Sequence, residues 1–162
     1  MKVNSIPSAK AVLVVDPGDA SAAELCALLH GFGYAADRAT DAGAALGRMR
    51  ARAYAMVLIE AGPRQAQTVD LLKRLKAHDP AISAIILSAS ATLDAAAEYI
   101  RHGAYDVIGR PVDYADLGFV LRRAEEKRAL AGQLRRLKIR NRLLVLSIPL
   151  WMLLGYLLVR LL

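Results

Sequence analysis

The chain has 162 residues, 56% of them hydrophobic, and a formal net charge of +7. This length allows about one domain with a core of its own. The charge is uneven, because residues 1–121 carry 12 basic and 13 acidic side chains whereas residues 122–162 carry 10 and 2. The basic excess therefore lies outside the expected domain, and nucleic acid is excluded as the expected partner.

Cysteine usage and the first residues indicate a reducing cytoplasmic environment. Cys26 is the only cysteine, which excludes an intrachain disulfide and a cysteine-based metal cluster. It lies in an apolar helical pattern, so we expect a buried and inert thiol. Residues 1–10 form an N-terminal tail without the apolar stretch of a signal peptide.

Apolar runs alternate with stretches of helical periodicity along residues 11–121, the expected domain. We predict strands at 11–15, 34–39, 55–59, 82–88 and 105–108. We predict helices at 20–30, at 41–52, from the 61–67 loop to 78, at 91–102 and from 113 onward. Asp19 and Asp41 are the expected caps of the first two helices. Strict alternation of this kind predicts an α/β domain with a doubly wound, five-stranded parallel sheet.

The helix from 113 has no evident stop, so we expect an extended fifth helix whose basic part, 122–142, leads toward a membrane. Its apolar residues form a broken heptad-like stripe interrupted by Lys127: Val120, Leu121, Ala124, Leu130, Leu134 and Leu137. This pattern is compatible with a coiled coil that forms a homodimer, or with a solvated helix that only connects two parts.

Residues 143–159 contain no charged side chain over 17 positions. A helix of this length spans roughly 25 Å, and Arg142 and Arg160 at its flanks can reach the two interfaces. A helix lying in the interface would need a polar face, which the run lacks. We therefore predict a single transmembrane helix at 143–160. Since basic residues crowd the side before it, the N-terminal domain is expected in the cytoplasm, with the basic segment against anionic lipid.

Four polar residues lie at the ends of predicted strands: Asp16, Glu60, Ser88 and Arg110. The carboxyl ends of parallel strands meet at one edge of the sheet, so these side chains can converge. Two acids, a hydroxyl and a cation are the parts of a phosphate or metal pocket.

The order of several segments points to a family: VLVVD at 12–16, GFGY at 31–34, AYAMVLIE at 53–60, LLKRLKAHDP at 71–80, AIILSA at 84–89 and GAYDVIGRP at 103–111. From 11 to 128 the chain resembles the receiver domain of bacterial two-component response regulators. The resemblance implies the flavodoxin-like strand order 2-1-3-4-5. It also implies that Asp16 is the first of two magnesium-binding acids, Ser88 the phosphoryl-contacting hydroxyl, and Pro111 the proline that usually follows a cis peptide bond.

Three positions depart from the family pattern. Pro17 stands where a second acid is expected, Glu60 where the phosphoryl-accepting aspartate belongs, and Arg110 where the family has lysine. Only Asp16 and Glu60 then remain as candidate magnesium ligands, and Asp19 in the following loop is a candidate substitute for the missing acid. The side chain of Glu60 is one methylene longer than that of the aspartate for which the geometry of phosphoryl transfer is built. We therefore expect no cofactor, with a Mg²⁺ ion on Asp16 and Glu60 as the weaker alternative.

The planar guanidinium of Arg110 suits a carboxylate partner better than a lysine would. Our hypothesis is that Glu60 and Arg110 pair directly beside Ser88, so that the carboxylate stands in for a phosphoryl group. The other interpretation is a drifted site in which both charges are solvated.

These patterns predict a tail-anchored pseudo-receiver of the bacterial inner membrane, without enzymatic activity. It would act in a phosphorelay through contacts with a histidine kinase or another regulator. Two alternatives remain open: a working phosphoacceptor that uses Glu60 or another acid, and a membrane scaffold or oligomerisation module. A flavodoxin-like cofactor binder is a further rival, which a bound chromophore would reveal.

Overall fold

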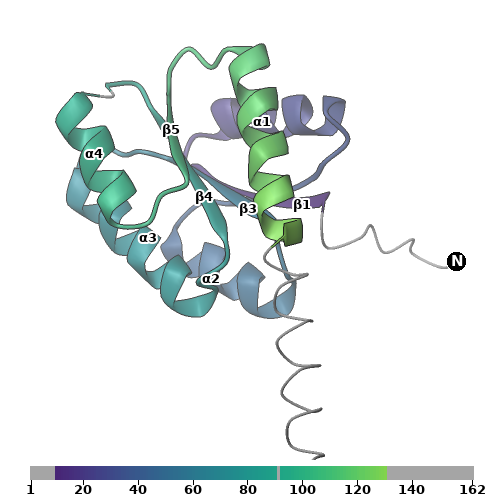
Figure 1. Ribbon diagram of the computed structural model, residues 1–162, viewed down its shortest axis with the longest axis horizontal. Helices are drawn as coiled ribbons and strands as arrows, with labels where there is room; N and C mark the ends of the chain where they lie inside the picture. Colours follow the sequence, from purple (N-terminus) through teal and green to yellow (C-terminus); the bar gives the residue numbers. More distant parts are fainter. Residues whose placement is uncertain (1–9, 91, 131–162) are drawn as a thin grey trace, which may run out of the picture. The chain divides into compact units, whose positions relative to one another are not determined.

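Residues 10–90 and 92–130 are described by the structure, a computed structural model (Figure 1). Within them strands and helices alternate as the sequence predicts. The elements are β1 (Ala11–Val15), α1 (Asp19–Gly31), β2 (Ala35–Ala39), α2 (Ala42–Ala51), β3 (Met56–Glu60), α3 (Gln65–His78), β4 (Ser83–Ser88), α4 (Leu93–Arg101) and β5 (Asp106–Gly109). A further helix occupies 114–130, up to the last described residue, and is called here the 114–130 helix.

The strands form a parallel sheet in the order β2-β1-β3-β4-β5, which confirms the order implied by the resemblance. β1 and β3 are direct neighbours, with Val15 opposite Ile59. β3 and β4 are paired in the same way, with Glu60 opposite Leu87. The residues that follow β1, β3, β4 and β5 therefore share one edge of the sheet.

Helices cover both faces of the sheet, because successive strand side chains point to opposite sides. Leu13 and Val57 pack with buried residues of α2, α3 and α4 on one face. Val12 and Leu58 pack with α1 and the 114–130 helix on the other. This three-layer arrangement buries β1, β3 and β4 almost completely, so their end residues are held in fixed positions.

The predicted cap of α1 is wrong. Gly18 is the N-cap and makes no side-chain cap hydrogen bond, while Asp19 lies in the first turn. The α2 cap is confirmed, because the Asp41 carboxylate accepts a hydrogen bond from the backbone N–H of Ala44 at 2.9 Å. Cys26 is half-buried instead of buried, because it packs at the margin of the core between α1 and the sheet.

The 114–130 helix packs on the sheet through the first part of its apolar stripe. Leu117, Val120, Leu121 and Ala124 are buried in the domain core. Val120, Leu121 and Ala124 are therefore not available for a coiled coil, whereas Leu134 and Leu137 lie outside the described residues. A core seam and a coiled-coil seam have the same helical spacing, so the sequence pattern alone could not separate them.

Polar contacts also hold this helix to the domain well beyond residue 121. The Tyr34 hydroxyl donates to the Glu125 carboxylate at 3.0 Å. The Arg128 guanidinium lies 3.1 Å from an Asp79 carboxylate oxygen. The compact unit accordingly runs to Arg128, past the end at 121 that the sequence suggested.

Among residues 10–90 and 92–130 there is no helix with the length and apolar character needed to cross a membrane. The predicted transmembrane helix at 143–160, its flanking Arg142 and Arg160, and most of the basic segment 122–142 lie outside the described residues.

Candidate functional site

The four predicted site residues all reach the carboxyl edge of the sheet. Asp16 directly follows β1, Glu60 ends β3, Ser88 ends β4, and Arg110 directly follows β5. The backbone N–H of Arg110 donates to the Ser88 carbonyl at 3.0 Å, which extends the pairing of β4 and β5 into the site. The sheet thus positions the residues whose side chains would do the chemistry.

Glu60 and Arg110 are paired. The Nε and Nη2 groups of Arg110 donate to the same carboxylate oxygen of Glu60, at 2.9 and 2.7 Å. The Glu60 side chain is 19% exposed and the Arg110 side chain 24%. The structure therefore shows an ion pair that is shielded from most of the solvent. It does not show two freely solvated charges.

The surroundings of Arg110 stabilise its positive charge. Its pKa is raised above the ordinary value, chiefly by the hydrogen bonds to Glu60, while partial burial acts in the opposite direction. The negative charges of Glu60, Asp16 and Glu24 add to the upward shift. The guanidinium is therefore a permanent cation at the position where receivers place a lysine.

The carboxylate of Asp16 is hydrogen-bonded to residues at the start of α1. It is only 2% exposed, and its two oxygens accept hydrogen bonds from the Gly18 N–H at 2.7 Å and the Ser21 hydroxyl at 2.5 Å. Gly18 makes this arrangement possible, because an added Cβ would lie 2.8 Å from the Ser21 Oγ and 3.2 Å from an Asp16 oxygen. Neither Gly18 nor Ser21 was predicted as a site residue, although glycine after Pro17 and serine early in a helix are a recognisable local signal.

These residues do not fit a magnesium ion. Mg²⁺ requires near-octahedral oxygen ligation. Both Asp16 oxygens have hydrogen-bond donors, Pro17 offers no side-chain oxygen, and Glu60 is bound by Arg110. Asp19 pairs with Arg38 at 2.5 Å and cannot replace the missing acid without breaking that pair. In the described part of the chain no group of three or more His, Cys, Asp or Glu side chains is arranged for a metal.

Ser88 and Pro111 keep the family pattern. Ser88 is 5% exposed, and its hydroxyl makes no hydrogen bond within the described residues. The Arg110–Pro111 peptide bond is cis, as the resemblance implied. Ser88 and Pro111 therefore lie at the strand ends where the resemblance implied them.

Glu60 also borders an open cavity of about 500 Å³ between the ends of β1 and β3 and the helices α2 and α3. Pro17, Thr40 and Gly62 are among the residues that line it. A small reagent can therefore approach the carboxylate from this side.

The chain was compared with known proteins. The family model for the response regulator receiver domain matches residues 12–122. The transcriptional regulatory protein ZraR of Escherichia coli O157:H7 is 33% identical over 113 residues, which cover 70% of this chain and 26% of ZraR. The nitrogen assimilation regulatory protein NtrX of Azorhizobium caulinodans is 27% identical over 129 residues, or 78% of this chain and 28% of that protein.

Solved structures give the same picture. NtrX from Brucella abortus, in complex with ADP, superposes with a TM-score of 0.73 and 27% identity, covering 81% of this chain and 29% of NtrX. A response regulator receiver domain protein from Clostridium thermocellum has a TM-score of 0.69 and 22% identity, covering 75% of this chain and 98% of its own. The chain spans about a quarter of the length of the curated relatives it matches. The chain belongs to the response regulator receiver domain family of two-component systems.

Proposed function

We propose that this protein is a pseudo-receiver: a receiver domain that takes up no phosphoryl group and signals through a constant surface. The observation that carries the proposal is the pair between Glu60 and Arg110, which occupy the positions of the phosphoryl acceptor and the conserved cation. Receiver domains interact with histidine kinases and other signalling proteins. A domain held in one state would engage such a partner by contact alone.

Two physical reasons support the loss of phosphoryl transfer. In-line transfer depends on positioning and on neutralisation of charge by metal ions and cations. Glu60 places its carboxylate one methylene further from the backbone than aspartate does, and Arg110 already neutralises that carboxylate. Asp16 is held by Gly18 and Ser21, so the remaining acid offers no free pair of oxygens for a metal.

Phosphorylation of the full chain with acetyl phosphate and Mg²⁺ tests this proposal. We expect the intact mass to stay unchanged, and no hydroxylamine-labile adduct on Glu60. Because the cavity beside Glu60 is open, an unreacted carboxylate reports on chemistry and not on access. A phosphoryl adduct on Glu60, or on another acid of the site, would establish a working receiver instead.

A variant with the family residues restored is the matched positive control. Pro17→Asp, Glu60→Asp and Arg110→Lys together return the second acid, the shorter acceptor and the flexible cation. Residue 17 is exposed, so an aspartate there meets no core atoms. Uptake of phosphate by the triple variant alone would show that these three changes, and not the rest of the fold, silence the site.

We further propose that residues 143–160 hold the domain at the cytoplasmic face of a bacterial inner membrane. The support is the uncharged apolar run at 143–159 and the basic residues that precede it. Extraction of membranes at alkaline pH should leave the protein in the pellet. Leu153→Arg places a charge near the centre of the run, at a cost of roughly 3 kcal/mol, and should release a fraction of the protein. Full release of the unaltered chain would overturn the proposal of a membrane anchor.

A further inference from the structure

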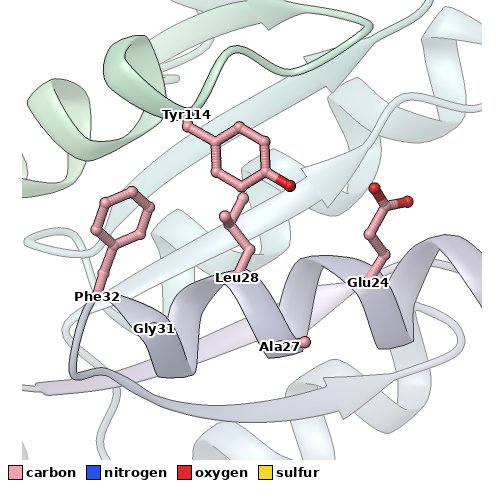
Figure 2. A pocket seen from close by; sticks show the side chains of 6 residues that line it. All are labelled: Glu24, Ala27, Leu28, Gly31, Phe32 and Tyr114. Atoms are coloured by element: carbon pink, nitrogen blue, oxygen red, sulfur yellow. The ribbon is translucent and has the colours of Figure 1, made fainter.

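An apolar groove of about 480 Å³ runs between α1 and the start of the 114–130 helix (Figure 2). Glu24, Leu28 and Phe32 project from one side of α1 toward Tyr114. Phe32 is 40% exposed and Tyr114 63%, so two aromatic rings lie largely in solvent. Large exposed apolar side chains gathered around a hollow are typical of an interaction surface.

The solvent side of α1 carries a row of small residues beside three polar ones, Asp19, Glu24 and His30. Its exposed positions include Ala20, Ala23, Ala27 and Gly31. Gly31 has no packing role within the domain, because a Cβ there would meet nothing within 4 Å. Small residues at this face let a second helix approach closely.

Opposite charges mark the two ends of this surface. Glu24 lies at one end of the groove. Arg122 lines the adjoining hollow at the other end, together with Phe32 and Gly118. Both side chains are exposed, and neither forms an ion pair with another described residue. On α1, Leu28 lies midway between Glu24 and Phe32.

We infer that this groove binds a second copy of the chain. A two-fold axis close to Leu28 would set the two α1 helices antiparallel and bring Glu24 of each copy to Arg122 of the other. Such an interface is self-complementary, as a two-fold dimer requires, because an acid and a base lie on opposite sides of an apolar centre. Phe32 and Tyr114 would be covered at the same time. The surface adjoins Arg110, which lines a neighbouring hollow together with Glu24, Leu28 and Tyr114. The inference does not rest on the proposed function, because it makes no use of phosphoryl transfer at Glu60.

Crosslinking of the full chain in intact cells tests this inference. In a Cys26→Ala background, Ala27→Cys puts one thiol on the groove near the expected axis. A short bismaleimide should then yield a covalent dimer. Ala97→Cys in the same background is the matched control, because position 97 is also exposed but lies on α4, away from the groove, and should give no dimer.

Charge reversal makes the test specific. Added to the Ala27→Cys chain, Glu24→Arg alone should abolish the crosslinked dimer, and Arg122→Glu alone should do the same. The two reversals together should restore it, which also shows that both variants fold. Absence of a dimer from the Ala27→Cys chain, crosslinking only to a different protein, or a yield indifferent to single reversal would each overturn the inference.

Discussion

Arg110 holds a single carboxylate oxygen of Glu60 with two N–H groups, at 2.9 and 2.7 Å, across the ends of β5 and β3. The pair links two strands that are not neighbours, since β4 lies between them. The pair therefore joins the ends of β3 and β5 directly, and we expect it to stabilise the domain.

The Glu60–Arg110 pair should contribute measurably to stability. Glu60→Gln and Arg110→Ala should each lower the free energy of unfolding by about 1–2 kcal/mol, because each leaves a partly buried charged group without its partner. A double-mutant cycle should give a coupling energy of about 1 kcal/mol. Urea unfolding of residues 1–128 is a suitable measurement, because the core residues of the described part all lie between 11 and 124.

The exposed pair of Asp70 and Arg74 on α3 is the internal control. Its atoms are also 2.9 Å apart, but both side chains are more than half exposed. Its coupling energy should be only about 0.3–0.5 kcal/mol. Equal coupling in the two cycles would mean that burial adds nothing to the Glu60–Arg110 pair.

Glycine-to-alanine substitutions at two positions should change the free energy of unfolding in opposite directions. Gly18→Ala puts a methyl group 2.8 Å from the Ser21 Oγ and should disturb the hydrogen bonds that hold Asp16. We expect a loss of roughly 1–2 kcal/mol. Gly47→Ala, inside α2 with no atom within 4 Å of the new Cβ, should instead stabilise by about 0.5–1 kcal/mol. Thermal unfolding of both variants checks the prediction, and a neutral Gly18→Ala would contradict the role given to this turn.

Alkaline pH should weaken the contact between Tyr34 and the 114–130 helix. Burial, and then the hydrogen bond to Glu125, raise the pKa of Tyr34 from 10.0 to about 12. The folded state therefore keeps the phenol proton more tightly than the unfolded state. This contribution to stability is complete below pH 10 and is lost as the pH rises from 10 to about 12.

Comparison with Tyr34→Phe isolates that contribution. The difference in unfolding free energy between the two proteins should be constant up to pH 10 and should then shrink. Burial also shifts the pKa of Tyr54 upward and that of Lys76 downward. Both groups are present in the two proteins, so their contributions cancel in the difference. A difference that stays constant to pH 12 would show that Tyr34 is not the source of the loss of stability at alkaline pH.

Much of the fold could be predicted because strand and helix periods differ. The strand at 11–15 and the helix cap at Asp41 could be predicted from local signals alone, and the structure contains both elements. The α1 cap was wrong because two signals competed: Asp19 is a good cap in isolation, but Asp16 reaches Gly18 and Ser21 first. A local pattern does not show which of two nearby acids the turn will use.

The site was predictable in position and partly in chemistry. Strand ends located Glu60 and Arg110, and the shape of a guanidinium suggested their pairing. The engagement of Asp16 by Ser21 was not foreseen, because it depends on how the loop after β1 closes. The packing of Leu121 and Ala124 could not be foreseen either, because core and coiled-coil stripes share the same spacing.

The end of the folded unit can be tested by truncation. A chain ending after 121 lacks the buried Ala124, the Glu125 acceptor of Tyr34, and the Arg128 guanidinium that contacts Asp79. Together these losses should cost roughly 2–4 kcal/mol, a large part of the stability of a small domain. A chain ending after 128 retains all three and should unfold cooperatively at a higher urea concentration.

Single substitutions separate the parts of that loss. Arg128→Ala in the longer fragment should cost about 1 kcal/mol, since the pair with Asp79 is only partly buried. Ala124→Asp should cost more, because it buries a charge against the sheet. Equal stability of the 121 and 128 fragments would show that the helix beyond 121 is not needed by the domain. The contacts of Glu125 and Arg128 would then be incidental, and those residues would be free to serve a partner.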